Sequence, residues 1–370
     1  MPLAKKSKQW LLILGGLGLL GALLARSLRT NPEWRAFRWR VFLESLLAID
    51  PVWALIAVGS VYLTYLIRAL RWRVLMRPLK ARPSLWNLLS ATVIGFAAIG
   101  IFGRAGEMVR PYLVARREGV PVSSQVAVWL VERCFDTLTL LVTASLGLRQ
   151  LQAKGLEGSP TLTRVLNRGG DLIVVSTLGL LVLLFVLRNF AEPITRWLIG
   201  KLRSLHPRSL SAGRLARLEQ TLGAFEAGTR GIRNLRTLAG CTLYSAAEWI
   251  LIAFCCMAVF NCFSGGLRLS TSEVLIFMGS IMLGSLVNIP GVGGGIQVAS
   301  LLALTELFAV RPETAASISL LIWVFTFLAV VPPALLLMLY EGLNWAKLRN
   351  LEAESEDAMS ILRSSGGQGR

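Results

Sequence analysis

The 370-residue sequence has few of the side chains on which soluble enzymes rely. It contains one histidine, His206, and four aspartates, none of them in an Asp-x-Asp pair. A histidine-based metal site or catalytic triad is therefore excluded, and metal-dependent sugar transfer through paired aspartates is not expected. The five cysteines show neither paired metal spacing nor a disulfide framework. We expect no metal, no cofactor and no enzymatic activity.

Charge is also scarce, and long apolar windows take its place. Charged residues make up 16% of the chain and hydrophobic residues 54%, whereas soluble domains carry about 25% charged residues. A bilayer crossing needs roughly 20 apolar residues. Six windows come close to this length: residues 10–25, 51–67, 122–148, 172–187, 238–260 and 314–340. We predict an all-α integral membrane protein with about six full transmembrane helices.

The charges that are present orient the chain in its membrane. The net charge of +18 could suit nucleic acid, but the basic residues stand beside apolar spans, as in cytoplasmic loops. Residues 188–236 carry ten Arg or Lys against three Glu, and residues 68–82 carry six basic side chains. With both segments cytoplasmic, both termini are cytoplasmic too. We predict a multi-pass protein of the cell inner membrane whose partners are the bilayer and anionic lipid, with no nucleic acid.

Two apolar stretches break where glycine and proline interrupt a helix. Residues 85–102 run into a Gly-Arg-Ala-Gly-Glu segment and return near residue 117, and residues 274–289 run into Pro-Gly-Val-Gly-Gly-Gly and return near residue 310. Both patterns predict re-entrant hairpins, whose broken backbone must be covered by protein or line a cavity. A constant shift of 190 residues superimposes the two, which predicts an inverted repeat. A chance match of hydropathy is the alternative.

These patterns divide the chain into five segments. Residues 1–45 form an N-terminal helix and interfacial segment, 46–148 the first repeat, 149–237 the fifth helix with a basic cytoplasmic amphipathic segment, 238–341 the second repeat, and 342–370 a polar tail. The first hairpin is predicted to enter from the cytoplasm and the second from outside. The tail is predicted to be disordered because it offers little apolar surface to bury.

The first repeat is unusually ionic for a membrane interior. Each charged side chain costs about 2.5–3.5 kcal/mol at the bilayer centre, so these residues should face inward and pair. Their formal charges sum to zero, and they are Arg104, Glu107, Arg110, Glu132, Arg133 and Asp136. A structural ion network and a substrate site are both compatible with this pattern. A bound phosphate would add uncompensated charge, so we expect a proton on Glu107 to accompany it.

The second repeat has glycine where the first has charge. Its Gly-rich run is predicted to open a short helix, whose free N–H groups and dipole favour an anion such as phosphate. Tight helix packing is the alternative role of the glycines. Glu248 stands in the middle of the sixth span and should point inward. The candidate binding residues of this half are Glu248, Asn288, Gly291, Gly293, Gly294 and Gln297.

Together these motifs resemble the lysylphosphatidylglycerol synthase transmembrane family. The resemblance is carried by Gly-Arg-x-Gly-Glu-x-x-Arg at residues 103–110, by the Glu-Arg-x-x-Asp helix at residues 132–136, and by the later Pro-Gly hairpin. It covers roughly residues 10–340 and implies a flippase-like protein without the synthase domain. Gln297 stands where a Glu is usual and Trp323 where an Arg is usual, which argues against aminoacyl-phosphatidylglycerol as the substrate.

The resemblance and the residues together favour a lipid flippase or transporter. Its expected substrate is an anionic phospholipid or a polyprenyl-phosphate-linked molecule, bound at the midplane between the two hairpins. Two alternatives stay open. The protein could be a membrane enzyme of lipid or glycan synthesis, or a non-transporting partner of a separately encoded synthase or glycosyltransferase.

Overall fold

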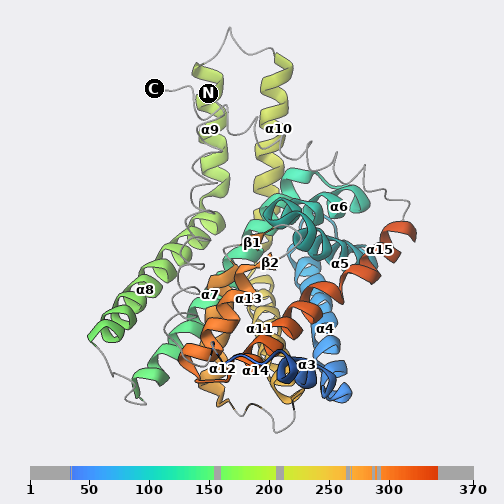
Figure 1. The fold of residues 1–370 in the computed structure, drawn as a ribbon. Coiled ribbons are helices and arrows are strands. Elements are labelled where there is room, and N and C mark those ends of the chain that lie inside the picture. Colours follow the sequence, from blue (N-terminus) through green and yellow to red (C-terminus); the bar gives the residue numbers. More distant parts are fainter. Residues whose placement is uncertain are drawn as a thin grey trace.

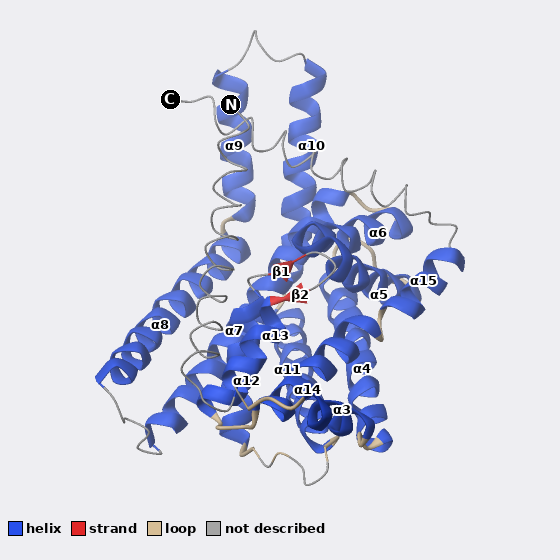
Figure 2. Cartoon of the chain, viewed as in Figure 1, coloured by secondary structure: helices blue, strands red, loops and turns tan. Residues whose placement is uncertain are grey.

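The computed structural model describes residues 34, 36–153, 160–205, 212–263, 267, 269–285, 288–289 and 293–340. Within these ranges the protein is all-α, apart from one pair of two-residue strands set among the helices (Figures 1 and 2). The predicted first span at residues 10–25 and the predicted disordered tail at residues 342–370 lie outside the described residues, as do residues 290–292 of the Gly-rich run.

The helices follow the predicted order, with breaks at the two hairpins. The first half contains α3 (Trp39–Leu47), α4 (Pro51–Leu75), α5 (Leu85–Phe102), the 3₁₀ turn η1 (Gly103–Met108), α6 (Val109–Glu118) and α7 (Val122–Ala153). The middle contains α8 (Pro160–Asn189), α9 (Ala191–Leu205), α10 (Ala212–Thr229) and η2 (Arg230–Arg233). The second half contains α11 (Leu235–Asn261), α12 (Thr271–Ser285), β1 (Asn288–Ile289), β2 (Gly293–Gly294), α13 (Gly295–Leu302), η3 (Ala303–Leu307), α14 (Pro312–Trp323), η4 (Val324–Leu328) and α15 (Val331–Tyr340).

Helices α4 and α11 form an antiparallel pair at the centre of the fold. The N–H of Asp50, just before α4, donates to the carbonyl of Cys262, just after α11, over 2.9 Å. Asp50 also caps α4, because its carboxylate accepts from the N–H of Val52 at 2.8 Å. The helix continues to Leu75, beyond the predicted end at residue 67. Hydropathy falls at Arg68, but the helix persists because its arginines are paired inside the protein.

The two breaks are closely packed helical hairpins. In the first, the chain turns at Gly103 (φ 66°), and α6 returns along α5 so closely that a Cβ on Gly95 would lie 2.7 Å from the Cβ of Arg110. In the second, β1 and β2 pair antiparallel, with Asn288 opposite Gly294. A Cβ on Gly284 would lie 2.4 Å from the carbonyl oxygen of Gly295. Backbone therefore meets backbone in both hairpins, which only glycine allows.

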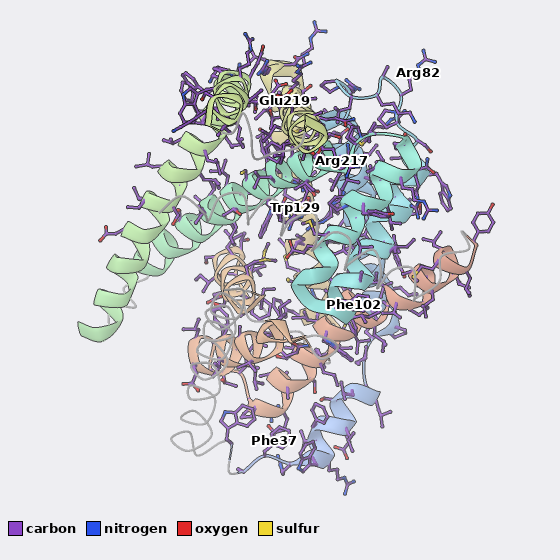
Figure 3. All side chains as sticks on the ribbon, turned by 90° about the horizontal axis from the view of Figure 1, so that it is seen from above. Phe37, Arg82, Phe102, Trp129, Arg217 and Glu219 are labelled. Atoms are coloured by element: carbon purple, nitrogen blue, oxygen red, sulfur yellow. The ribbon has the colours of Figure 1, made fainter. Side chains whose placement is uncertain are left out.

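Helices α9 and α10 project side by side beyond the rest of the molecule (Figure 1). Their region was predicted as an amphipathic segment at the membrane surface. Helix α10 instead packs against α7 over its C-terminal part, where a Cβ on Gly228 would lie 2.3 Å from the carbonyl oxygen of Ser124. Seen from above, Arg217 and Glu219 of α10 lie near the part of α7 that carries Trp129 (Figure 3).

Four described helices are long and apolar enough to cross a membrane: Pro51–Leu75, Leu85–Phe102, Leu235–Asn261 and Pro312–Tyr340. A fifth span results if Val174–Asn189 and Ala191–Lys201, bent by 72°, count as one. The predicted count of six is not reached within the described residues. Helix α7 is absent from this set, and α5, predicted as one arm of a re-entrant hairpin, is in it. The protein is therefore a multi-pass membrane protein with four to five candidate spans among the residues described.

The glycine packing of the second hairpin leads to a stability prediction. Replacing Gly284 with Ala forces α12 away from α13, because the added methyl group overlaps the backbone of Gly295. Overpacking of this kind costs about 1–3 kcal/mol. Gly279→Ala is the matched control on the same helix, since nothing lies within 4 Å of a Cβ there. We expect a lower melting temperature in detergent for Gly284→Ala alone, and equal values for the two variants would contradict the close packing.

Candidate functional site

Seven charged side chains from four helices meet in the interior of the protein. We call them the ion cluster: Arg68 and Arg71 of α4, Arg110 of α6, Glu132, Arg133 and Asp136 of α7, and Glu248 of α11. The cluster joins the central helix pair to the first hairpin and to α7. Such a group is stable away from water only when its charges compensate one another.

Arg71 is the centre of the cluster. Its side chain is 0% exposed, and it reaches carboxylates on two different helices. The two terminal guanidinium nitrogens lie 2.8 Å from Glu132, 2.7 Å from Asp136 and 3.2 Å from Glu248. One of them also donates to the hydroxyl of Ser245 at 2.7 Å. A planar guanidinium suits this role because its donors spread in fixed directions.

Arg110 ties the first hairpin to the cluster. Its Nη1 donates to both carboxylate oxygens of Glu132, at 3.0 and 2.9 Å, and its Nη2 donates to the carbonyl of Arg68 at 3.2 Å. The guanidinium also stacks over the ring of Trp72, 3.9 Å from its centroid. A desolvated cation over an aromatic face adds to the ion pairing.

Arg68 lies at the opposite side of Arg71, against α11 and α5. It forms an ion pair with Glu248 and lies 3.6 Å from Asp136. Its guanidinium stands over the ring of Phe96, 4.7 Å from the centroid. Glu248, a fully buried carboxylate on an apolar helix, is thus held between Arg68 and Arg71.

Arg133 differs from the other six because its side chain is 36% exposed. It lies 2.9 Å from Asp136 and 3.7 Å from Glu132, both of which already pair with Arg71. Glu107 of η1 is near enough for its charge to act on Arg133. Arg133 is therefore the arginine of the cluster that a ligand can reach.

The structure brings together five of the twelve predicted site residues: Arg110, Glu132, Arg133, Asp136 and Glu248. Glu107 lies beside them, whereas the side chains of Arg104 and Asn288 and all of Gly291 lie outside the described residues. Gly293 and Gly294 form β2, so the helix α13 begins only after the Gly-rich run, at Gly295. Gln297 lies in the first turn of that helix.

The tips of the two hairpins lie next to each other. Cα atoms of β1 come within 8 Å of those of η1, although the two segments are about 180 residues apart in the chain. The first tip carries Glu107, and the second brings the backbone of Asn288 and Gly294. The proximity of the two tips places the second repeat beside the ion cluster.

Sequence reasoning missed Arg68 and Arg71. The apolar window ended at residue 67, so both arginines were assigned to a cytoplasmic basic loop. Their spacing of three residues, directly after an uninterrupted apolar run, was the available signal, because it places both on one side of a continuing helix. Adding them and Glu248 changes the charge sum. The predicted six residues balance to zero, whereas the ion cluster has four arginines and three carboxylates.

Among the described residues no group of three or more His, Cys, Asp or Glu is arranged to hold a metal ion. The carboxylates of the ion cluster are each committed to arginines instead. The chemistry of the site is that of cation–anion pairing.

The pairing at Glu132 predicts a large loss of stability when its charge is removed. Glu132→Gln leaves Arg71 and Arg110 without their shared carboxylate, and breaking a buried ion pair costs about 3–5 kcal/mol. Glu44→Gln is the control, since the Arg40–Glu44 pair is exposed and such pairs contribute little. We expect a strong drop in melting temperature for Glu132→Gln only. An unchanged value would mean that the cluster does not hold the helices together.

The sequence matches one protein-family model over residues 10–334, that of the lysylphosphatidylglycerol synthase TM region. No curated protein matches the sequence. The matched range includes both hairpins and every residue of the ion cluster. With most of its length matched, and with a multi-pass helical fold around a buried charged site, the chain belongs to the lysylphosphatidylglycerol synthase transmembrane family.

Proposed function

We propose that the protein moves a lipid with an anionic headgroup across the cell membrane, as a flippase or transporter and not as an enzyme. The observation that carries the proposal is Arg133, a partly exposed arginine at the edge of an otherwise buried ion cluster. Guanidinium groups bind phosphate in bidentate fashion. An anionic phospholipid and a polyprenyl-phosphate-linked substrate both supply such a phosphate. The family supports a membrane lipid-related function.

The lengths of the returning arms support re-entrant hairpins. Helix α6 has 10 residues and α13 has 8, continued by the five of η3. At about 1.5 Å per residue, neither arm spans the roughly 30 Å of a hydrocarbon core. Each hairpin would then enter and leave on the same face. Broken helices that meet at membrane depth are where transporters of this architecture bind their substrates.

The arrangement of the repeats supports an inverted topology. A shift of 190 residues relates α4 to α11, and these two helices pack antiparallel at the centre of the fold. The hairpins that follow them bring their tips together. Two hairpins that enter from opposite faces and meet would close the site toward both sides in turn, which alternating access requires.

Transport by reconstituted protein is the direct test. We expect vesicles with the wild-type protein to move a fluorescent phosphatidylglycerol analogue between leaflets faster than protein-free vesicles. Arg133→Gln should slow this at least about tenfold, because a charge-assisted hydrogen bond contributes about 1.5–3 kcal/mol. Arg73→Gln, which removes an exposed arginine of α4, should leave the rate unchanged. Wild-type rates equal to those of empty vesicles would refute the proposed function.

Cysteine labelling tests the topology. In a background without the five native cysteines, Arg116→Cys reports on the end of the first hairpin and Arg311→Cys on the end of the second, and both positions are exposed. The positive-inside rule places the termini and Arg116 in the cytoplasm of an inner-membrane protein. We expect Arg116→Cys to react only from the cytoplasmic side and Arg311→Cys only from outside. Labelling of both from one side would rule out the inverted repeat.

A further inference from the structure

The charges of the ion cluster do not balance. Four arginines face three carboxylates, which leaves one positive charge. Arg104 and Glu107, on the adjacent hairpin tip, have opposite formal charges and leave this sum unchanged. The cluster is therefore a site with a net charge of +1 when every member is ionised.

The protein has no internal way to remove this charge. A guanidinium does not lose its proton in proteins. The three carboxylates are ionised by their surroundings, because each lies within 3.2 Å of Arg71. An uncompensated charge in a medium of low dielectric constant is unfavourable. A bound anion is the remaining source of compensation.

Arg133 is the residue at which this excess is available. The carboxylates that it contacts are shared with Arg71, and Glu132 is shared with Arg110 as well. Its Nε–H donor has no hydrogen-bond acceptor among the described residues. The other three arginines are buried, with Arg68 and Arg110 each covered by an aromatic ring. A ligand anion would therefore meet Arg133 first and complete its pairing.

We propose that this site selects a phosphodiester headgroup of single negative charge over a phosphomonoester, because one negative charge completes the ion cluster without a proton. A phosphodiester carries one negative charge, whereas a phosphomonoester carries about −1.5 to −2 at pH 7. The inference rests on the proposed function and narrows it. Phosphatidylglycerol and a polyprenyl-phosphate-linked sugar satisfy the rule, but phosphatidate and free polyprenyl phosphate do not.

Equilibrium binding in detergent tests the inference without requiring transport. Native mass spectrometry would compare phosphatidylglycerol and phosphatidate of identical acyl chains, with a polyprenyl-phosphate-linked hexose as a third probe. We expect the wild-type protein to prefer phosphatidylglycerol over phosphatidate by about tenfold or more, which corresponds to about 1.4 kcal/mol. Preference for the hexose over phosphatidylglycerol would assign the site to the glycan-linked source of the same phosphodiester. Equal affinities for phosphatidylglycerol and phosphatidate would overturn the inference.

Charge-shifting variants separate selectivity from folding. Glu248→Gln raises the sum to +2 and should move the preference toward phosphatidate, and the double variant Arg68→Gln/Glu248→Gln returns it to +1 and should restore the wild-type ratio. Arg133→Lys keeps the charge and should keep the ratio at lower affinity, while Arg133→Gln should lose it. Arg73→Gln is the control outside the cluster. If Glu248→Gln does not fold, the Arg133 pair still decides, because a merely structural arginine would not alter the ratio of two lipids.

The binding and transport results fail independently. Selective binding of phosphatidylglycerol without any movement between leaflets would overturn the proposed function and leave the charge rule standing. Movement of phosphatidylglycerol and phosphatidate at equal rates and affinities would overturn the charge rule and leave the proposed function standing.

Discussion

The buried guanidinium of Arg71 is the interaction on which the rest of the structure depends. A fully enclosed cation requires anions close by, and here they come from α7 and α11. Those carboxylates in turn require Arg68 and Arg110, so α4, α6, α7 and α11 are fixed relative to one another by one set of mutual pairings. Apolar packing alone discriminates poorly between helix arrangements in a lipid environment. The ion cluster supplies specificity that hydrophobic side chains would not.

The two hairpins are held by different forces, although they occupy related places in the chain. The first is fixed by the ion pair and hydrogen bonds of Arg110, in addition to the close approach of Gly95. The second is held at Gly284 by backbone contact, and it presents a short strand pair at its tip. An asymmetric site of this kind keeps the charge on one wall. The opposite wall can then move past a bound headgroup without breaking ion pairs.

Local features of the fold were predictable, and long-range pairings were not. The break after residue 102 followed from glycine in an apolar run, and the start of α4 from Asp50 and Pro51. The inward orientation of Glu248 followed from the cost of a carboxylate in an apolar helix. Arg71 escaped because its partners lie 61 or more residues away, and hydropathy treats any charge as the end of a span. The strand pair escaped because neither two-residue strand has a detectable periodicity.

The additional arginines also change what could drive lipid movement. A site that is neutral when empty must take up a proton together with an anion, which was the basis for expecting proton coupling through Glu107. A site of charge +1 does not, because the headgroup itself completes the balance. The lipid then carries its own negative charge through the membrane field, where each elementary charge changes in energy by about 2.3 kcal/mol per 100 mV. In a cell whose interior is negative, that term favours movement of the anionic headgroup outward, so the membrane potential alone suffices to give transport a direction.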